Sequence, residues 1–546
     1  MTLRIHQLTL PLDYKEQDLR EAAAAKLGCN EMHLDKVTII RRSIDARPQR
    51  KKPVYVISVE LTIKGLSVRA EDVRSADIEF LTQKDNEPYA FPSVALSLPT
   101  RPSPVIIGAG PAGLMAALAL AQAGLSPILF ERGDPVAERI AHVRRFWEQG
   151  ALNPESNVLF GEGGAGLFSD GKLIARSKDR KRVRYFLETL VRCGAPRSIL
   201  IDAEPHLGSD LLSHIVPAIR HLIERAGGEM RFHARLEGIA IEKGALRGIQ
   251  VNGEKKEVST CILAPGHSAR DVYTMLAQAG VPMEPKSFAV GVRVELPQHI
   301  IDTSRFGRYA GHPCLGAASF RLTRKAESSS RACYTFCMCP GGKVISCASS
   351  DGFLTTNGMS LSKRSGDFGN AAFLVPVSPA DFPTSCKNET PASAGIEFQM
   401  GIEHAAYIEG GSDYSVPAAL LTDFISGTPT KNLPSTRSWH RSKPADIRCI
   451  LPDFVCDTLS IAIPKMLRLL KGIHCEDALL YASETRTSSP VRILRNEKRE
   501  SVVVNGLYPA GEGSGYTGGI VSSALDGLRA AEALIKTYYR GEHVSF

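Results

Sequence analysis

Residues 104–133 read PVIIGAGPAGLMAALALAQAGLSPILFERG, and this stretch decides the fold. An apolar run, Val105-Ile106-Ile107, leads into a glycine turn at 108–110, from which an apolar helix is expected to reach about Gly124. A second apolar run, 128–130, ends at Glu131. A strand, a tight glycine turn, a helix and a strand, with an acid about 20 residues after the glycines, form the fingerprint of a dinucleotide-binding fold.

Each residue of the fingerprint has a physical role. Gly108 allows the turn, Gly110 lets the backbone approach a pyrophosphate, and Gly113 lets the helix pack closely on the strand. The helix N-terminus offers unpaired N–H groups and partial positive charge to phosphates, and Glu131 can accept hydrogen bonds from ribose hydroxyls. A chance glycine pattern and a membrane helix of ~20 residues are the competing interpretations. The strand–helix–strand context, Pro111 and the terminal acid favour a buried βαβ unit.

The bulk composition narrows the class of protein. A chain of 546 residues should hold more than one domain. With 43% hydrophobic and 23% charged residues it is not a disordered or fibrous protein. A net charge of +8 fits an anionic cofactor or substrate and gives no argument for nucleic acid.

The N-terminus and the cysteines point to the cytoplasm. The start, MTLRIHQLTLPLDYKEQD, lacks a cationic segment followed by an apolar core, so no signal peptide is expected. Twelve cysteines without a compact framework suit free thiols in a reducing compartment. We therefore expect a cytoplasmic protein that acts on a small molecule and has no membrane partner.

Residues 1–95 are expected to form a small separate module. Strands are predicted at 5–10, 37–44 and 54–63, with an alanine-rich helix at 15–27 that Gly28 ends. This order is compatible with a ferredoxin-like α+β module. The basic tip at 47–52 has two interpretations, a contact to RNA or phosphate and a solvated hairpin end; the second is preferred. A Pro- and Ser-rich linker follows at 96–103.

Glycines recur amid apolar residues at 157–173, NVLFGEGGAGLFSDGKL. Such a loop indicates backbone packed against something flat or charged. The turn Asp170-Gly171-Lys172 either places Lys172 near a flavin or its phosphates or leaves an exposed lysine. A second stretch, CILAPGHSARD at 261–271, predicts a strand whose small residues let the chain pass a dinucleotide. His267 there is either catalytic or a polar, partly buried residue, and the second is preferred.

From residue 287 to 475 short strands alternate with long polar loops, which we interpret as an inserted substrate domain. Its segment YTFCMCPGG, at 334–342, places Cys337 and Cys339 on one face of a strand. The pair is either a redox or metal-binding thiol pair or two small buried cysteines. Spacing along one strand is poor for an unstrained disulfide.

The C-terminal segment GLYPAGEGSGYTGGIVSSALDGLRAAEALI, at 506–535, predicts a strand, a tight turn carrying Glu512, and a long helix opened by Gly518-Gly519-Ile520. Glu512 is placed to bind a ribityl chain. The helix start can stabilise negative charge on a reduced isoalloxazine. A site built from both ends of the chain points to FAD rather than to a transient NAD site.

Arginines near these segments are candidates for catalysis. Arg486 precedes the C-terminal strand and could anchor an anionic substrate, stabilise flavin charge or form a structural ion pair. Arg293 is a weaker candidate, because an arginine at a domain junction often pairs with a local carboxylate. With Cys337 and Cys339, Arg486 completes the predicted catalytic set.

Most of the chain resembles the bacterial FAD-dependent dehydrogenase family, whose FAD domain is of the para-hydroxybenzoate hydroxylase and glutathione reductase type. The similar motifs are FGEGGAGLFSDGKL, APGHSARD, YTFCMCPGG, ETRTSSPVRI and PAGEGSGYTGGIVSSALDG. The resemblance implies non-covalent FAD held by the first fingerprint, Glu131, the 161–172 loop and the 511–520 segment. The expected cofactor-binding residues are Gly108, Gly110, Pro111, Ala112, Gly113, Glu131, Arg132, Gly163, Gly164, Ala165, Gly166, Lys172, Leu236, Ala264, Gly266, Gly511, Glu512, Gly518, Gly519 and Ile520.

The predicted fold class is α/β, with a Rossmann-type FAD-binding domain at 104–286 and 476–546, an inserted α+β substrate domain at 287–475, and the N-terminal module. The predicted function is hydride transfer between flavin N5 and an organic substrate. Only one dinucleotide fingerprint is visible, so NAD(P)H is expected only as a transient reductant. The alternatives are an RNA-modifying flavoprotein that uses the N-terminal module, and a non-catalytic redox sensor read out by the thiol pair.

Overall fold

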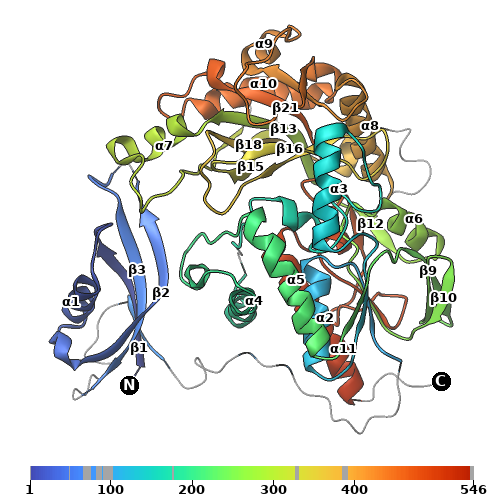
Figure 1. The fold of residues 1–546 in the computed structure, drawn as a ribbon, viewed down its shortest axis with the longest axis horizontal. Coiled ribbons are helices and arrows are strands. Elements are labelled where there is room, and N and C mark those ends of the chain that lie inside the picture. The colour runs from blue at the N-terminus through green and yellow to red at the C-terminus, as the bar shows by residue number, and fades with distance from the viewer. Residues whose placement is uncertain are drawn as a thin grey trace.

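The computed structural model describes residues 2–47, 49–64, 76–81, 89, 91, 102–174, 177–325, 331–383 and 392–540. These residues include three sheets of four or more strands. Figure 1 shows the N-terminal module at one side, a parallel sheet with its helices at the other, and a larger sheet lying across the top of the molecule. The predicted linker at 96–103 lies outside the described residues except for its last two.

The N-terminal module is a four-stranded antiparallel sheet with strand order β2-β3-β1-β4. This order is that of a ferredoxin-like sheet, as predicted. In β3 the alternating apolar residues are buried and pack under α1. The elements are β1 (Thr2–Leu10), α1 (Glu16–Leu27), η1 (Glu31–His33), β2 (Leu34–Asp45), β3 (Val54–Ile63) and β4 (Ile78–Phe80).

The dinucleotide-binding fold is a five-stranded parallel sheet with order β23-β11-β5-β6-β7. The fingerprint forms β5 (Val105–Ile107), α2 (Pro111–Gln122) and β6 (Ile128–Phe130). The C-terminal strand β23 (Leu507–Pro509) pairs with β11 (Cys261–Leu263), so both ends of the chain build one sheet. The Rossmann-type prediction is confirmed.

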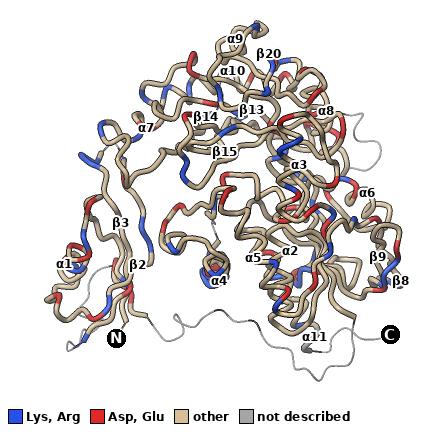
Figure 2. Tube along the Cα trace, in the orientation of Figure 1, with Lys and Arg blue, Asp and Glu red and all other residues tan. Residues whose placement is uncertain are grey.

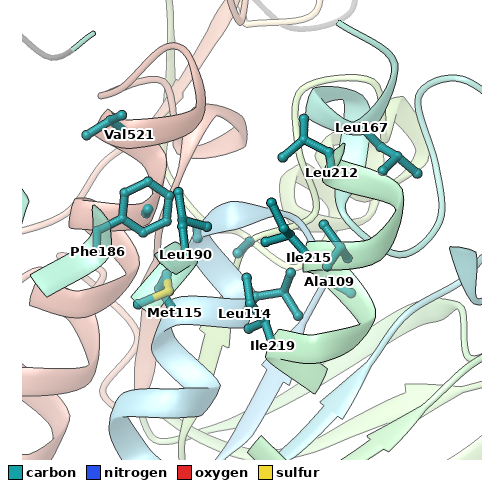
Figure 3. Packing of buried hydrophobic residues seen from close by; sticks show 14 of the residues in the cluster. Ala109, Leu114, Met115, Leu167, Phe186, Leu190, Leu212, Ile215, Ile219 and Val521 are labelled. Carbon is teal, nitrogen blue, oxygen red and sulfur yellow. The ribbon is translucent and has the colours of Figure 1, made fainter. Parts of the chain in front are cut away.

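Helix α2 is apolar on all sides because neighbours cover it on all sides. Its residues from Ala112 to Ala121 are buried, and the neighbouring helices belong to segments more than 50 residues away along the chain. The neighbours are α4 (Arg180–Arg192), α5 (Ser209–Arg225) and α11 (Ile520–Arg540). Figure 3 shows this packing through the side chains Ala109, Leu114, Met115, Leu167, Phe186, Leu190, Leu212, Ile215, Ile219 and Val521. A stiff, close-packed core therefore supports the fingerprint turn.

The remaining elements of this part surround the sheet. A three-stranded antiparallel sheet of order β10-β9-β8 lies between β7 and β11 in the chain. The elements are α3 (Val136–Gln149), η3 (Gly164–Phe168), η4 (Arg197–Leu200), β7 (Glu229–Arg231), β8 (Leu236–Glu242), β9 (Ala245–Val251), β10 (Glu254–Glu257), α6 (Arg270–Gln278), β12 (Met283–Pro285), β22 (Val491–Ile493) and η10 (Glu512–Ser514).

The inserted segment forms a seven-stranded, mostly antiparallel sheet of order β14-β15-β18-β13-β21-β19-β20. Its elements are β13 (Phe288–Pro297), α7 (Gln298–Phe306), η5 (Gly307–Tyr309), β14 (Thr323–Lys325), β15 (Ala332–Cys339), β16 (Lys343–Cys347), β17 (Thr355–Met359), β18 (Phe368–Val377), η6 (Pro379–Asp381), α8 (Ala394–Glu409), β19 (Val416–Leu420), α9 (Leu421–Ser426), β20 (Ser442–Pro444), η8 (Ile447–Cys449), α10 (Asp453–Leu467), η9 (Cys475–Asp477) and β21 (Leu479–Glu484).

Strand β21 corrects one predicted boundary. The insertion was expected to end at residue 475, yet β21 lies between β13 and β19 in the middle of its sheet. An all-buried apolar run of this kind fits the middle of either sheet, so its pattern alone does not tell which sheet it joins. The other proposed domain boundaries stay predictions.

Basic and acidic residues interleave along the chain, as Figure 2 shows for all three parts of the molecule. At the basic tip of the N-terminal module, Arg47 and Arg50 both pair with Asp45 at 2.7 and 3.0 Å. Hydrogen bonds from Arg47 hold the pKa of Asp45 well below its ordinary range. One carboxylate thus offsets part of the tip's positive charge, and both arginines are held against their own hairpin, which supports the solvated-hairpin interpretation over an RNA contact.

Candidate functional site

A cavity of about 660 Å³ opens between the parallel sheet and the inserted sheet. Its wall includes the fingerprint turn, the 159–172 loop, the residues after β11, the start of β13, strands β15 and β17, and segments 484–488 and 511–523. Every predicted cofactor-binding residue except Gly113 and Gly163 lines it. The three predicted catalytic residues, Arg486, Cys337 and Cys339, line it as well.

Close backbone contacts require glycine at two positions of the fingerprint, Gly108 and Gly113. Gly108 has φ +96°, and a Cβ there would lie 2.3 Å from the Ala264 carbonyl oxygen. A Cβ on Gly113 would lie 1.8 Å from the Gly108 carbonyl oxygen, which explains why Gly113 supports the turn without reaching the cavity. Helix α2 begins at Pro111 with no side-chain cap from Gly110. Its first N–H groups are therefore available to an anion in the cavity.

Glu131 has a different set of partners from the one predicted. Its buried carboxylate accepts hydrogen bonds from the backbone N–H groups of Ala109, Gly133 and Gly161, at 2.7, 2.9 and 3.1 Å. Glu131 thus ties the fingerprint turn to the second glycine loop. A carboxylate has about four acceptor positions, so one remains for a ribose hydroxyl on the cavity side.

Arg139 holds the second glycine loop and was missed by the sequence analysis. This fully buried side chain donates to the carbonyl oxygens of five loop residues at 2.7–3.2 Å. Burial lowers its pKa to about 10. One sequence signal was available: Arg139 continues the buried face of α3, with Val136, Val143 and Phe146. The five loop residues are Asn157, Val158, Gly161, Glu162 and Gly164.

The C-terminal segment forms the opposite rim. Gly511 has φ +74°, and Glu512 lies in η10, where it accepts a hydrogen bond from the Gly519 backbone. Burial raises the pKa of Glu512 to about 7. A Cβ at Gly519 would meet no protein atom within 4 Å. Bare backbone at the start of α11 therefore faces open space.

Lys172 lines the cavity, where the first of its two interpretations placed it, and its ammonium is already paired. Its ammonium donates to the Met338 carbonyl oxygen of β15 and lies 3.6 Å from the Asp170 carboxylate. Asp170 in turn pairs with Arg364. Both side chains of Lys172 and Asp170 line the cavity. Lys172 thus joins the glycine loop to the inserted sheet rather than standing free for a phosphate.

The cysteine pair sits on a bulge, so strict alternation does not hold. The β15–β18 register shifts between Phe336 and Cys339, and Cys337 has φ +40°. Cys337 is exposed to the cavity while Cys339 is buried, with its thiol 3.2 Å from the Cys337 carbonyl oxygen. Bulges next to active sites often redirect a side chain. Desolvation raises the pKa of the Cys337 thiol to about 12, which disfavours a nucleophilic thiolate.

Arg293 pairs with a carboxylate, as expected for an arginine at a domain junction. Its guanidinium is fully buried and grips Glu484 at 2.8 and 3.1 Å. Attraction to Glu484 raises the pKa of Arg293 against the opposing effect of burial. Glu484 lines the cavity and was missed, because the motif SETRT carries no spacing that marks an acid as functional.

Arg486 also pairs with a carboxylate. Its Nε and Nη2 donate to Glu403 of α8 at 3.0 and 2.9 Å, and its Nη1 donates to Ser349 at 2.8 Å. His267 is neutral, since burial and the charge of Arg486 lower its pKa to about 3. The structure thus favours the partly buried polar interpretation of His267.

The described residues contain no group of three or more His, Cys, Asp or Glu side chains arranged for a metal ion. Within the same part of the chain, none of the helices combines the length and the apolar character needed to cross a bilayer. The donor set of the cavity fits a dinucleotide instead. It has an uncapped helix start for phosphate, an acceptor for ribose, and glycine backbone at 266 and 519 facing open space.

Three family models match this chain. The model of FAD-dependent proteins, C-terminal domain-like, matches residues 287–487, and that of pyridine nucleotide-disulphide oxidoreductases matches residues 102–273. A domain of unknown function matches residues 2–62. The two oxidoreductase-related regions, 102–273 and 287–487, both contribute residues to the wall of the cavity described above.

Relatives extend the match to the whole chain. An uncharacterized protein of Clostridium beijerinckii is 41% identical over 543 residues, which cover 98% of this chain and 99% of the relative. Protein FixC of Escherichia coli is 25% identical over 225 residues, 39% of this chain and 48% of FixC. The flavin-dependent brominase Bmp2 is 13% identical over 81% of this chain and 79% of its own, with a TM-score of 0.38. By its full-length match and its family models, the chain belongs to the same family as the Clostridium protein, a family of FAD-dependent oxidoreductases.

Proposed function

We propose that the protein moves a hydride between N5 of a non-covalently held FAD and an organic substrate bound in the same cavity. One observation carries this proposal. The cavity has dinucleotide-binding loops on one wall, and β15, β17 and segment 484–488 of the inserted sheet on the other. A cofactor bound to the first wall would present its reactive part to a small molecule held by the second.

The first wall supplies the cofactor contacts. The start of α2 at Gly110 and Pro111 would hold the pyrophosphate, and Glu131 would accept from the ribose. Glu512 and the start of α11 would hold the ribityl chain and the pyrimidine edge. When bound, FAD supplies a two-electron carrier that accepts or donates a hydride. We assign these roles to the expected cofactor-binding residues that line the cavity, with Gly113 and Gly163 as their support.

The second wall is where we place the substrate. Arg486 is our first candidate for binding it, because its guanidinium reaches the cavity and is held rigidly by Glu403. Cys337 is the second, since its side chain projects from a bulge into the same space. Cys339 lies behind it and would act only through Cys337. A nicotinamide cofactor would enter this half of the cavity only transiently as a reductant.

The compartment is also a proposal. The cysteines of the described residues are all free thiols, in keeping with a reducing cytoplasm. The alternatives from the sequence gain less support. The paired basic tip does not favour an RNA substrate, and the raised pKa of Cys337 does not favour a thiol-based sensor.

The test is spectroscopic. We expect purified protein to show flavin absorbance, to release FAD on denaturation, and to be bleached anaerobically by NADH, NADPH or an organic substrate from a metabolite panel. A control titration of free FAD under the same conditions should show no comparable reduction. Protein that is colourless and cannot be reconstituted with FAD would refute the proposal. Bound FAD that nothing in the panel reduces would favour the redox sensor.

A further inference from the structure

Two arginines share one carboxylate at the edge of the cavity. Glu403 is fully buried and accepts from Arg270 at 2.9 and 3.0 Å and from Arg486 at 2.9 and 3.0 Å. Thr485 adds a hydrogen bond of 2.8 Å to the same carboxylate. We call Arg270, Glu403 and Arg486 the arginine–glutamate cluster. It joins α6 of the parallel-sheet part to α8 and the end of β21 in the inserted part.

The cluster carries an excess positive charge. The two guanidinium groups hold the pKa of Glu403 far below its ordinary range, so the cluster contains two cations and one anion. The side chains of Arg270 and Arg486 are only 13% and 6% exposed. A buried charge without a counter-ion is strongly unfavourable. An anion bound in the adjoining cavity would supply the missing charge.

Neighbouring groups do not balance this charge. His267 stays neutral because the positive charges of Arg486 and Arg270 add to its burial in lowering its pKa. Lys286 adds a further cationic group and donates to Ser488 at 2.6 Å. Of the acids that line the cavity, Glu484 is paired with Arg293, and the cation that acts on Glu512 is Lys286 rather than either arginine of the cluster. The field at this end of the cavity is therefore positive.

Polar atoms without protein partners belong to residues of the same part of the wall. Arg486 has five N–H donors, and the contacts to Glu403 and Ser349 occupy three of them. His267 lines the cavity, and its Nδ1 is buried with no hydrogen-bond partner. The nearest carboxylate oxygen, Oε1 of Glu512, is 3.7 Å away, beyond hydrogen-bond range. The Thr487 hydroxyl is already bonded to the Ala289 carbonyl oxygen, whereas the Ser488 hydroxyl, which accepts from Lys286, also lines this part of the wall.

We infer that the arginine–glutamate cluster and His267 form the recognition site for an anionic group of the substrate, so that the substrate is an organic acid. This inference rests on the proposed function, since it names the substrate class of the same cavity. Arg486 would donate to a carboxylate of the substrate, with Arg270 supplying charge and Glu403 fixing the guanidinium plane. In the proposed function the phosphates of FAD would bind at the start of α2, on the opposite wall, so they would not supply this anion.

The same positive field could instead serve negative charge on the reduced flavin. Both readings involve an anion beside Arg486, and they differ in when the anion is present. A substrate carboxylate binds to the oxidised protein, whereas flavin charge develops only on reduction. Binding of carboxylates to the oxidised holoprotein therefore separates the two sources.

The experiment titrates oxidised, FAD-loaded protein with formate, acetate, benzoate and indole-3-acetate and follows the visible flavin spectrum. The matched neutral probes are formamide, acetamide, benzamide and indole-3-acetamide. We expect at least one acid to perturb the spectrum saturably and to bind at least about tenfold more tightly than its amide, because hydrogen bonds to charged groups are the stronger ones. If no acid binds, or acids and amides bind equally, the inference is overturned.

Variants then locate the site. Arg486→Met should weaken binding of the responsive acid about tenfold or more with unchanged FAD content, and Arg486→Lys should restore part of it. Arg184→Met, which removes an exposed arginine paired with Glu188, is the control and should bind the acid normally. Acid binding that survives in Arg486→Met, together with a shifted flavin midpoint potential, would assign the cluster to the flavin instead.

The two proposals fail separately. Binding of an acid to the oxidised protein needs no turnover, so the organic-acid inference can be confirmed even if no reductant bleaches the flavin. Reduction of FAD by NADPH with no response to any acid would uphold flavin redox chemistry and sink the organic-acid assignment. If Arg486→Met does not fold, the comparison of acids with amides on the wild-type protein still decides the question.

Discussion

Arg42 in β2 and Asp202 after η4 are joined by both backbone and side chain. The Arg42 backbone N–H donates to Ile201 at 2.6 Å, its carbonyl accepts from Ala203 at 2.8 Å, and its guanidinium grips the Asp202 carboxylate at 2.8 and 3.0 Å. Residues 205–207 then hydrogen-bond to the loop that carries Lys172. The edge strand of the N-terminal module is therefore only a few residues from the cavity wall.

This contact predicts coupled stability. Arg42→Glu should lower the free energy of unfolding by about 1 kcal/mol, since both partners are roughly one-third exposed and solvent screens the pair. Asp202→Arg in the same background should recover much of the loss. The readout is a double-mutant cycle by denaturant unfolding. Arg41→Glu, at an exposed neighbouring position, serves as the control, and a cycle with zero coupling would contradict the role of the pair.

A second prediction concerns the fingerprint turn. Gly113→Ala should lose most of its bound FAD and destabilise the protein by roughly 1–3 kcal/mol, because the new methyl group would collide with the Gly108 carbonyl. The measurement is flavin absorbance per protein after purification. Gly401→Ala, in open space on α8, should bind FAD normally. Normal FAD content in Gly113→Ala would show that the turn tolerates a wider helix–strand spacing.

A third prediction tests the arginine that holds the second glycine loop. Arg139→Met should destabilise the protein by at least ~3 kcal/mol, because several buried carbonyl groups would lose the hydrogen bonds that the guanidinium donates to them. Thermal unfolding and FAD retention should both fall. Arg144→Met, on the exposed side of the same helix, should stay within about 0.5 kcal/mol of wild type. Equal behaviour of the two variants would exclude a special role for Arg139.

A fourth prediction concerns pH and the FAD-free protein. The pKa of Glu512 is raised from 4.5 to about 7, so between these values the folded state holds a proton that the unfolded state has released. Its contribution to stability is therefore lost as pH rises from 4.5 to 7. The pKa of His267 is lowered from 6.5 to about 3, so its contribution grows as pH rises across that range.

Glu512→Gln should abolish the loss of stability that wild type shows between pH 4.5 and 7. The variant should then be about 1–3 kcal/mol more stable than wild type above pH 7. His267→Gln should flatten the rise from pH 3 to 6.5. Denaturant unfolding across this pH range measures both. Parallel stability curves for wild type and the two variants would mean that neither group titrates in the folded protein as its burial implies.

A fifth prediction addresses the thiols. In FAD-free protein, iodoacetamide should modify Cys337 more slowly than the surface thiol Cys314, because the raised pKa leaves little thiolate. FAD should protect Cys337 further, while buried Cys339 stays unmodified in both forms. Peptide mass spectrometry reads each site. Cys337→Ser and Cys339→Ser variants with normal turnover would retire the thiol-pair hypothesis.

Local patterns were enough to predict the segments that form one wall of the cavity. The fingerprint strand, turn and helix, the second glycine loop, and the Glu512 turn each depend on residues within about 30 positions of one another. Backbone conformation and close approach, which glycine controls, are local properties of the chain. For the same reason, the sequence predicted three of the four strands of the N-terminal module.

Only the tertiary structure decided which charges meet. Glu403 lies 133 residues from Arg270 and 83 from Arg486, and Lys172 lies 166 residues from Met338. Such contacts follow from how whole sheets and helices pack, and no spacing in the sequence encodes them. The same holds for β21, whose apolar run fits either sheet until its neighbours are known. Residues 104–133 thus determined that a dinucleotide binds, while packing of the inserted sheet against them determined what faces it.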